Sequence, residues 1–196
     1  MLRSYWQTQQ ISHSVENATP LVVGLQLLST LELVHVLLGL TRGGAAQTFA
    51  QIGGRDICLF LTAAAEPAVR RSWVAALLYA TWAASEIIRY PYYATNLLEI
   101  CPDFLHWLRY SAFMLLYPLG FAAEVGCFVV AYPHMKAGDK YRIEGLPEGG
   151  QFAVLGAYML FAHAIGALTL FKYMLKARKR QLRQPAVTGT FTAKEE

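Results

Sequence analysis

A tyrosine and a glutamate lie seven residues apart within a long apolar stretch of the sequence, at Tyr117 and Glu124. Seven residues of α-helix turn through about 700°, about 20° short of two full turns, so both side chains project from one face, about 10 Å apart along the axis. Pro118 removes a backbone hydrogen bond beside the tyrosine and is expected to kink the helix. The hydroxyl and the carboxyl could therefore transfer protons to and from a bound substrate. The same pair could instead hydrogen-bond to neighbouring helices, and the residues alone leave both interpretations open.

Other ionisable residues also lie within apolar stretches, where each costs about 2.5–3.5 kcal/mol on insertion scales. Glu86 and Arg89 are three residues apart, so on a helix they share a face and can form an ion pair. The same two residues could instead contact a ligand, and the sequence does not decide between the two roles.

Glu32 and His35 form a Glu-x-x-His unit, the spacing that supplies metal ligands in di-iron helical bundles. Such a site needs a second unit and two more carboxylates. The pattern instead favours a buried Glu–His hydrogen bond between helices, predicts no metal, and disfavours a metal-dependent lipid hydroxylase. The chain has five histidines, of which no two are three or four residues apart: His13, His35, His106, His134 and His163.

The composition indicates what kind of scaffold must position these residues. Of the 196 residues, 55% are hydrophobic and 15% are charged, whereas about 25% are charged in an ordinary soluble domain. The apolar residues come in runs of about twenty, the length that crosses a hydrocarbon core as a helix. This excludes a disordered chain and disfavours a soluble α/β enzyme. The three cysteines are scattered, so neither a disulfide framework nor a zinc site is expected.

We predict an all-α fold, with one integral-membrane domain over residues 1–196 that forms a multi-pass bundle of about five transmembrane helices. Short polar segments rich in Gly, Pro and charge separate the five apolar runs. The second run is the weakest, because the polar stretch from Gly53 to Asp56 interrupts it. The predicted spans are residues 21–40, 45–65, 73–93, 104–132 and 151–175.

Basic residues concentrate after the last apolar run, between Lys176 and Arg183. Cytoplasmic flanks of membrane helices carry such clusters, so we expect a basic tail over residues 176–196 and a cytoplasmic C-terminus. The net charge of +4 does not indicate nucleic-acid binding, because no soluble scaffold is predicted that would present a basic patch. Residues 1–20 do not have the pattern of a signal peptide.

Four short segments, in order and in register, resemble a known family over about residues 20–180. They resemble the very-long-chain (3R)-3-hydroxyacyl-CoA dehydratases, once called protein-tyrosine-phosphatase-like proteins. Each motif alone is weak, and the specificity lies in their combination with Glu124. The segments are LELVHVLLG at 31–39, EIIRY at 86–90, WLRY at 107–110 and LYPLG at 116–120.

The resemblance implies an enzyme of the endoplasmic reticulum membrane that removes water from (3R)-3-hydroxyacyl-CoA to give trans-2-enoyl-CoA in fatty-acid elongation. The family's catalytic pair corresponds to Tyr117 and Glu124. Glutamate as base and tyrosine as acid fits the chemistry, and the reverse assignment also works. No cofactor is expected. Both Arg89 and Arg109 could contact substrate or belong to structural ion pairs, and the full set of candidate substrate contacts is Arg89, Tyr90, Arg109 and Tyr110.

The resemblance also implies partners, namely a long-chain 3-hydroxyacyl-CoA, membrane lipid and the other elongation enzymes (elongase, ketoacyl-CoA reductase and enoyl-CoA reductase). A catalytically silent scaffold of the elongation complex is the alternative function. Family members have six spans with both termini cytoplasmic, whereas no run here corresponds to their first span. Phosphatase chemistry is not expected, because it needs a cysteine six residues before an arginine and Val36 stands six residues before Arg42.

Overall fold

The computed structural model describes residues 2–39, 45–137, 144–145, 147 and 150–183, and within these ranges the elements are all helices. Nearly all are α-helices, and one segment near the C-terminus, η1, is a π-helix. The elements are α1 (Leu2–Leu37), α2 (Ala45–Leu61), α3 (Pro67–Arg70), α4 (Trp73–Leu97), α5 (Asp103–Ser111), α6 (Phe113–Ala137), α7 (Gly150–Ala157), η1 (Tyr158–His163) and α8 (Ala164–Gln181).

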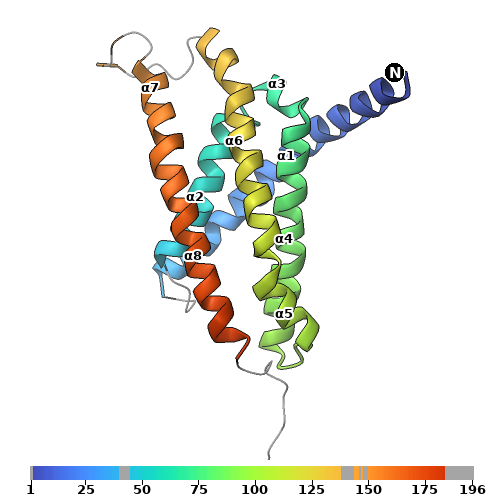
Figure 1. Ribbon diagram of the computed structural model, residues 1–196, viewed down its shortest axis with the longest axis vertical. Helices are drawn as coiled ribbons and strands as arrows, with labels where there is room; N and C mark the ends of the chain where they lie inside the picture. Colours follow the sequence, from blue (N-terminus) through green and yellow to red (C-terminus); the bar gives the residue numbers. More distant parts are fainter. Residues whose placement is uncertain (1, 40–44, 138–143, 146, 148–149, 184–196) are drawn as a thin grey trace, which may run out of the picture.

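The long helices form a bundle with α4 and α6 side by side, while α7, η1 and α8 run as one continuous segment along another side (Figure 1). Helix α1 packs on both α2 and α4. The core between α2, α4 and α6 includes the fully buried side chains of Leu59, Leu78 and Met135. A Cβ added at Gly126 of α6 would lie 2.9 Å from Cγ1 of Val74 of α4. Glycine at this position therefore allows the two central helices to pack closely.

Two segments are long and apolar enough to cross a membrane, Ser12–Leu37 in α1 and Asp103–Ala137 in α5 and α6. They fall in the first and fourth predicted spans. The all-α fold class is therefore confirmed over the described residues, and two segments have the length and composition of membrane helices. The count of five spans stays a prediction.

The first helix is longer than the predicted span, because it begins at Leu2 rather than at residue 21. Its N-terminal part extends away from the bundle (Figure 1). Val15 joins the hydrophobic core, and Oγ1 of Thr19 lies 3.0 Å from the hydroxyl of Tyr79 on α4. These tertiary contacts anchor turns that precede the predicted span of residues 21–40. The helix ends at Leu37, before Gly39, whose φ of +71° is a conformation that glycine adopts readily.

The second helix ends earlier than predicted, at Leu61 rather than at residue 65. The guanidinium of Arg70 donates hydrogen bonds to the carbonyl oxygens of Ala63 and Ala64, at 3.1 and 2.8 Å. This satisfies carbonyl groups that the end of the helix leaves without partners. The stretch from Gly53 to Asp56 does not interrupt α2, contrary to the expectation from its composition.

The remaining boundaries also differ from the predicted ones. The third and fourth spans continue to Leu97 and Ala137, and the fourth consists of two helices separated at Ala112. The fifth contains the π-helix and continues to Gln181, so residues 176–181 of the predicted tail are helical. Residues 184–196 of that tail lie outside the described part of the chain.

Candidate active site

Glu124 lies on α6 with a mostly buried side chain, whose relative exposure is 15%. The indole Nε1 of Trp82, on α4, donates a hydrogen bond of 3.3 Å to Oε1 of this carboxylate. The other oxygen, Oε2, lies 3.0 Å from Nε2 of His163 in η1. Both oxygens of Glu124 therefore have a neighbour on another helix, which holds the carboxylate in one place.

In the sequence, no other histidine lies three or four residues from His163, and nothing there links it to the candidate catalytic pair. The structure places it beside Glu124. Its ring stacks on Phe121, with centroids 5.2 Å apart and an interplanar angle of 14°, and its side chain is 8% exposed. Although Nε2 is at ion-pair distance from Glu124, it makes no aligned hydrogen bond with any described residue. His163 ends the π-helix, a form often found at functional sites.

Tyr117 lies on the same helix as Glu124, half-buried against α8. Its ring centroid is 5.9 Å from that of Phe171. No hydrogen bond joins Tyr117 to Glu124, whose carboxylate oxygens face Trp82 and His163. Side chains tilt toward the N-terminus of their helix, so Glu124 leans toward Tyr117.

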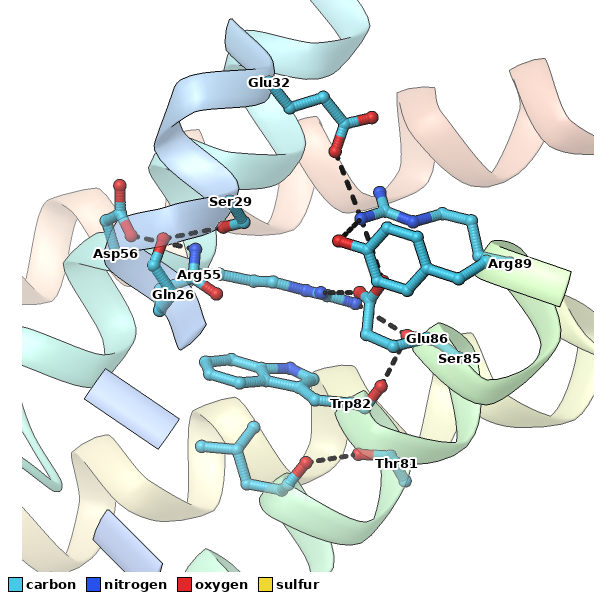
Figure 2. Close-up of polar contacts among 12 residues, drawn as sticks. Gln26, Ser29, Glu32, Arg55, Asp56, Thr81, Trp82, Ser85, Glu86 and Arg89 are labelled. Carbon is cyan, nitrogen blue, oxygen red and sulfur yellow. Dashed lines mark hydrogen bonds and ion pairs between the residues drawn. The ribbon is translucent and has the colours of Figure 1, made fainter. Parts of the chain in front are cut away.

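Arg55 lies in the middle of α2 and extends across to α4 (Figure 2). Its Nη1 is 2.7 Å from Oε1 of Glu86, and its Nη2 donates a 3.0 Å hydrogen bond to Oγ of Ser85. The guanidinium also lies over the ring of Trp82, 5.2 Å from its centroid. The next residue, Asp56, accepts a 2.9 Å hydrogen bond from Gln26 of α1. These partners explain why the polar stretch continues as helix.

Glu86 also pairs with Arg89, at 2.8 Å, which is one of the two roles that the i, i+3 spacing allows. Arg89 is buried and has a second carboxylate neighbour, Glu32 of α1, at 3.1 Å (Figure 2). A chain of polar contacts thus leads from α1 through α4 and α2 to the candidate catalytic carboxylate. Its members are, in order, Glu32, Arg89, Glu86, Arg55, Trp82, Glu124 and His163.

The four candidate substrate contacts fall into two groups. Arg89 donates a 3.3 Å hydrogen bond to the hydroxyl of the exposed Tyr90, and both belong to the region of the ion pairs. Arg109 lies near the C-terminal end of α5, 5.8 Å from the ring centroid of Tyr110, and donates a 3.4 Å hydrogen bond to Tyr93, which is one helical turn from Arg89 on α4. The role of the four candidates as substrate contacts stays a prediction.

The chain matches the sequence model of the family described as "Protein tyrosine phosphatase-like protein, PTPLA" over residues 26–184. The chain belongs to this family. The family match confirms the resemblance that the four motifs indicate.

Among curated proteins similar to this PTPLA-family chain is "Very-long-chain (3R)-3-hydroxyacyl-CoA dehydratase PASTICCINO 2" of Arabidopsis thaliana, 36% identical over 165 residues, which are 80% of this chain and 73% of that protein. PASTICCINO 2B of Oryza sativa subsp. japonica has the same identity and coverage. A "Very-long-chain (3R)-3-hydroxyacyl-CoA dehydratase" of Gallus gallus is 32% identical over 161 residues, 80% of this chain and 44% of that protein. No solved structure matches the chain.

The PTPLA family's phosphatase-like name is not reflected in the residues of this member. Val36, which stands at the position of the nucleophile, is an aliphatic residue of α1, and Arg42 lies outside the described residues. The expectation of a buried Glu–His hydrogen bond at the Glu-x-x-His unit is wrong, because Glu32 pairs with Arg89 and His35 is exposed. Over the described residues, no three His, Cys, Asp or Glu side chains gather as a metal cluster would require.

Proposed function

We propose that this protein dehydrates (3R)-3-hydroxyacyl-CoA to trans-2-enoyl-CoA in the elongation of very-long-chain fatty acids, with Tyr117 and Glu124 as the catalytic pair. The observation that carries the catalytic assignment is the mostly buried carboxylate of Glu124, which has Trp82 at one oxygen and His163 at the other and lies on the same helix as Tyr117. The relatives in the same family are named as dehydratases of this substrate.

Dehydration needs a base for the proton on C2, next to the thioester, and an acid for the departing hydroxyl on C3. Glu124 accepts the C2 proton, and the electrons of that bond form the C2–C3 double bond. The C3–O bond breaks, and the hydroxyl takes the proton of Tyr117 and leaves as water. A proton returned from Glu124 to Tyr117 then resets the pair for the next turnover. The opposite assignment of acid and base uses the same two residues.

The activity is tested in cells whose own dehydratase has been removed, where 3-hydroxyacyl-CoA accumulates. Expression of this chain should lower the 3-hydroxyacyl-CoA level and restore very-long-chain products. A chain that reaches the membrane but leaves the accumulated intermediate unchanged would contradict the proposed activity.

The same proposal includes the setting of the enzyme. The chain crosses the endoplasmic reticulum membrane several times as one domain, with its C-terminus in the cytoplasm, where acyl-CoA is present. The basic residues at the end of α8 support this orientation, because such residues are enriched in cytoplasmic flanks. The two reductases of the cycle are expected partners, because the ketoacyl-CoA reductase forms the 3-hydroxyacyl-CoA that this reaction consumes and the enoyl-CoA reductase uses the enoyl-CoA that it forms. The elongase, whose product the ketoacyl-CoA reductase takes up, is the third expected partner.

His163 positions the catalytic carboxylate, and His163→Ala should lower kcat about 10–100-fold with little change in KM, because a misplaced catalytic group costs rate rather than binding. His163→Gln, which keeps a polar group near Oε2 of Glu124, should retain more activity than alanine. Both variants are compared for the pH dependence of kcat, because a positioning partner of Glu124 alters that profile. Equal losses of kcat in both variants with an unchanged profile would contradict the positioning role.

Arg55 is expected to support both the fold and the site. Arg55→Met leaves Glu86 without its partner from α2, and breaking a mostly buried ion pair costs about 3–5 kcal/mol of stability. The double variant Arg55→Met/Glu86→Gln, which removes both charges, should recover part of this loss. Thermal unfolding in lipid measures the loss of stability in the single variants and its recovery in the double variant. If the double variant is destabilised by the sum of the two single variants, the pair is not coupled and the proposed network is wrong.

A further inference from the structure

An open surface cavity of about 400 Å³ lies at the C-terminal end of α8 and is lined by the exposed side chains of Lys176, Lys179, Arg180 and Arg183. The first three follow i, i+3, i+4 spacing and therefore lie on one face of the helix. Within the described part of the chain, none of the four forms an ion pair with a carboxylate. The cavity thus presents four cationic side chains to whatever enters it.

The end of α8 that carries this cavity is fixed against α5. Nε of Arg178 lies 3.3 Å from Oγ of Ser111, and Nε2 of His106 lies 3.2 Å from the carbonyl oxygen of Gln181. Because α5 leads directly into α6, this docking sets the basic cavity at the same end of the bundle as the start of α6, the end nearer to Tyr117.

The distance from the cavity to the candidate catalytic pair can be estimated along α8. Tyr117 contacts Phe171, and Lys179 is eight residues further along, about 12 Å at 1.5 Å per residue and about 80° around the helix. On a helix about 11 Å wide this turn adds about 7 Å sideways, so the direct path between the two positions is about 14 Å. The pantetheine arm of CoA is a chain of about thirteen bonds between its sulfur and its nearest phosphorus. Since an extended chain advances about 3.5 Å for every three bonds, the arm reaches about 15 Å. A thioester beside Tyr117 would therefore bring the phosphates of CoA to the basic cavity.

We propose that the cavity formed by Lys176, Lys179, Arg180 and Arg183 binds the phosphate groups of the CoA moiety of the substrate. This inference rests on the proposed function. Arginine offers a planar fork and lysine a compact charge to phosphate oxygens, and such charge-assisted hydrogen bonds are among the stronger ones. The CoA head is held at the membrane surface, the pantetheine arm runs along α8 to Tyr117, and the acyl chain continues past Glu124 into the bundle.

The test measures binding of free CoA to the full chain in discs of neutral phosphatidylcholine, so that it does not depend on turnover. The double variant Lys179→Gln/Arg180→Gln should weaken CoA binding at least about tenfold, the effect of losing hydrogen bonds to a charged group. Both side chains are exposed, so the exchange should not disturb folding. Lys136→Gln, at the far end of α6, is the matched control and should bind CoA as the unmodified chain does.

Two further probes identify which part of CoA is recognised. On the unmodified chain, 3′-dephospho-CoA should bind more weakly than CoA, and pantetheine, which has no phosphate, should bind equally weakly to the unmodified chain and to the double variant. Unchanged CoA affinity in the double variant would overturn the proposal. So would a double variant that binds anionic phosphatidylserine vesicles less well while its CoA affinity is unchanged, because the cavity would then hold lipid headgroups.

The failure of this inference differs from a failure of the proposed function. A chain that binds CoA through the cavity but never forms enoyl-CoA retains the CoA site and refutes the dehydratase activity. A chain that forms enoyl-CoA but binds CoA equally well with and without Lys179 and Arg180 retains the activity and refutes the cavity as the CoA site.

Discussion

We expect Tyr117→Phe to abolish dehydration while leaving membrane insertion and the protein level unchanged. The exchange removes only the hydroxyl, while the ring keeps its contact with Phe171. General acid–base catalysis by one side chain typically contributes about 10²–10⁴-fold, and a loss in this range is expected in the conversion of 3-hydroxyacyl-CoA to enoyl-CoA by purified membranes.

The matched control is Tyr173→Phe, which removes an exposed hydroxyl from α8 outside the proposed site. Its activity should equal that of the unmodified chain. A Tyr117→Phe protein with turnover within a few-fold of the unmodified chain would show that the hydroxyl takes no part in the chemistry.

Glu124→Gln should cause a loss of similar size, about 10²–10⁴-fold in kcat, because an amide cannot accept the C2 proton. Glutamine has nearly the size of glutamate, and its amide oxygen can still accept the hydrogen bond from Trp82. Substrate binding should therefore persist, and 3-hydroxyacyl-CoA should accumulate in cells that depend on the variant. The rates are measured on protein purified into lipid discs, with KM determined alongside kcat.

Glu16→Gln is the control for this exchange, since Glu16 pairs only with the exposed Arg71 outside the proposed site. If Glu124 merely joined helices, its glutamine variant would turn over normally. That outcome would favour the alternative of a catalytically silent scaffold for the elongation enzymes.

The helical class and the placement of Tyr117 and Glu124 on one helix could be predicted from the sequence, each for a physical reason, and the family followed from the resemblance of four motifs. Apolar runs of membrane length leave helices as the main way to satisfy the backbone. Tyr117 and Glu124 lie on one helix, so their relation depends on local geometry alone. Local geometry also allowed the Glu86–Arg89 ion pair, since i, i+3 spacing on a helix permits either an ion pair or a shared ligand contact. The structure contains the ion pair.

The contacts that bring residues from different helices together could not be predicted. Arg55 follows two glycines, which in the sequence indicate a break in the helix. In the structure α2 is continuous at this point, and Arg55 contacts Glu86 and Trp82 on α4. His163 reaches Glu124 from the π-helix, whose altered residue spacing the apolar pattern does not reveal. The Glu-x-x-His pattern favours a buried Glu–His hydrogen bond, whereas Glu32 pairs with Arg89, because nothing in the sequence indicates that Arg89 of α4 packs against α1.

The most direct test of the central claim uses the unmodified full chain alone, purified into lipid discs and supplied with a (3R)-3-hydroxyacyl-CoA. The proposed mechanism predicts that trans-2-enoyl-CoA forms without any added metal, cofactor or partner protein, and that the same preparation of Glu124→Gln forms none above background. An unmodified chain that binds the substrate or the elongation enzymes but yields no enoyl-CoA would contradict it.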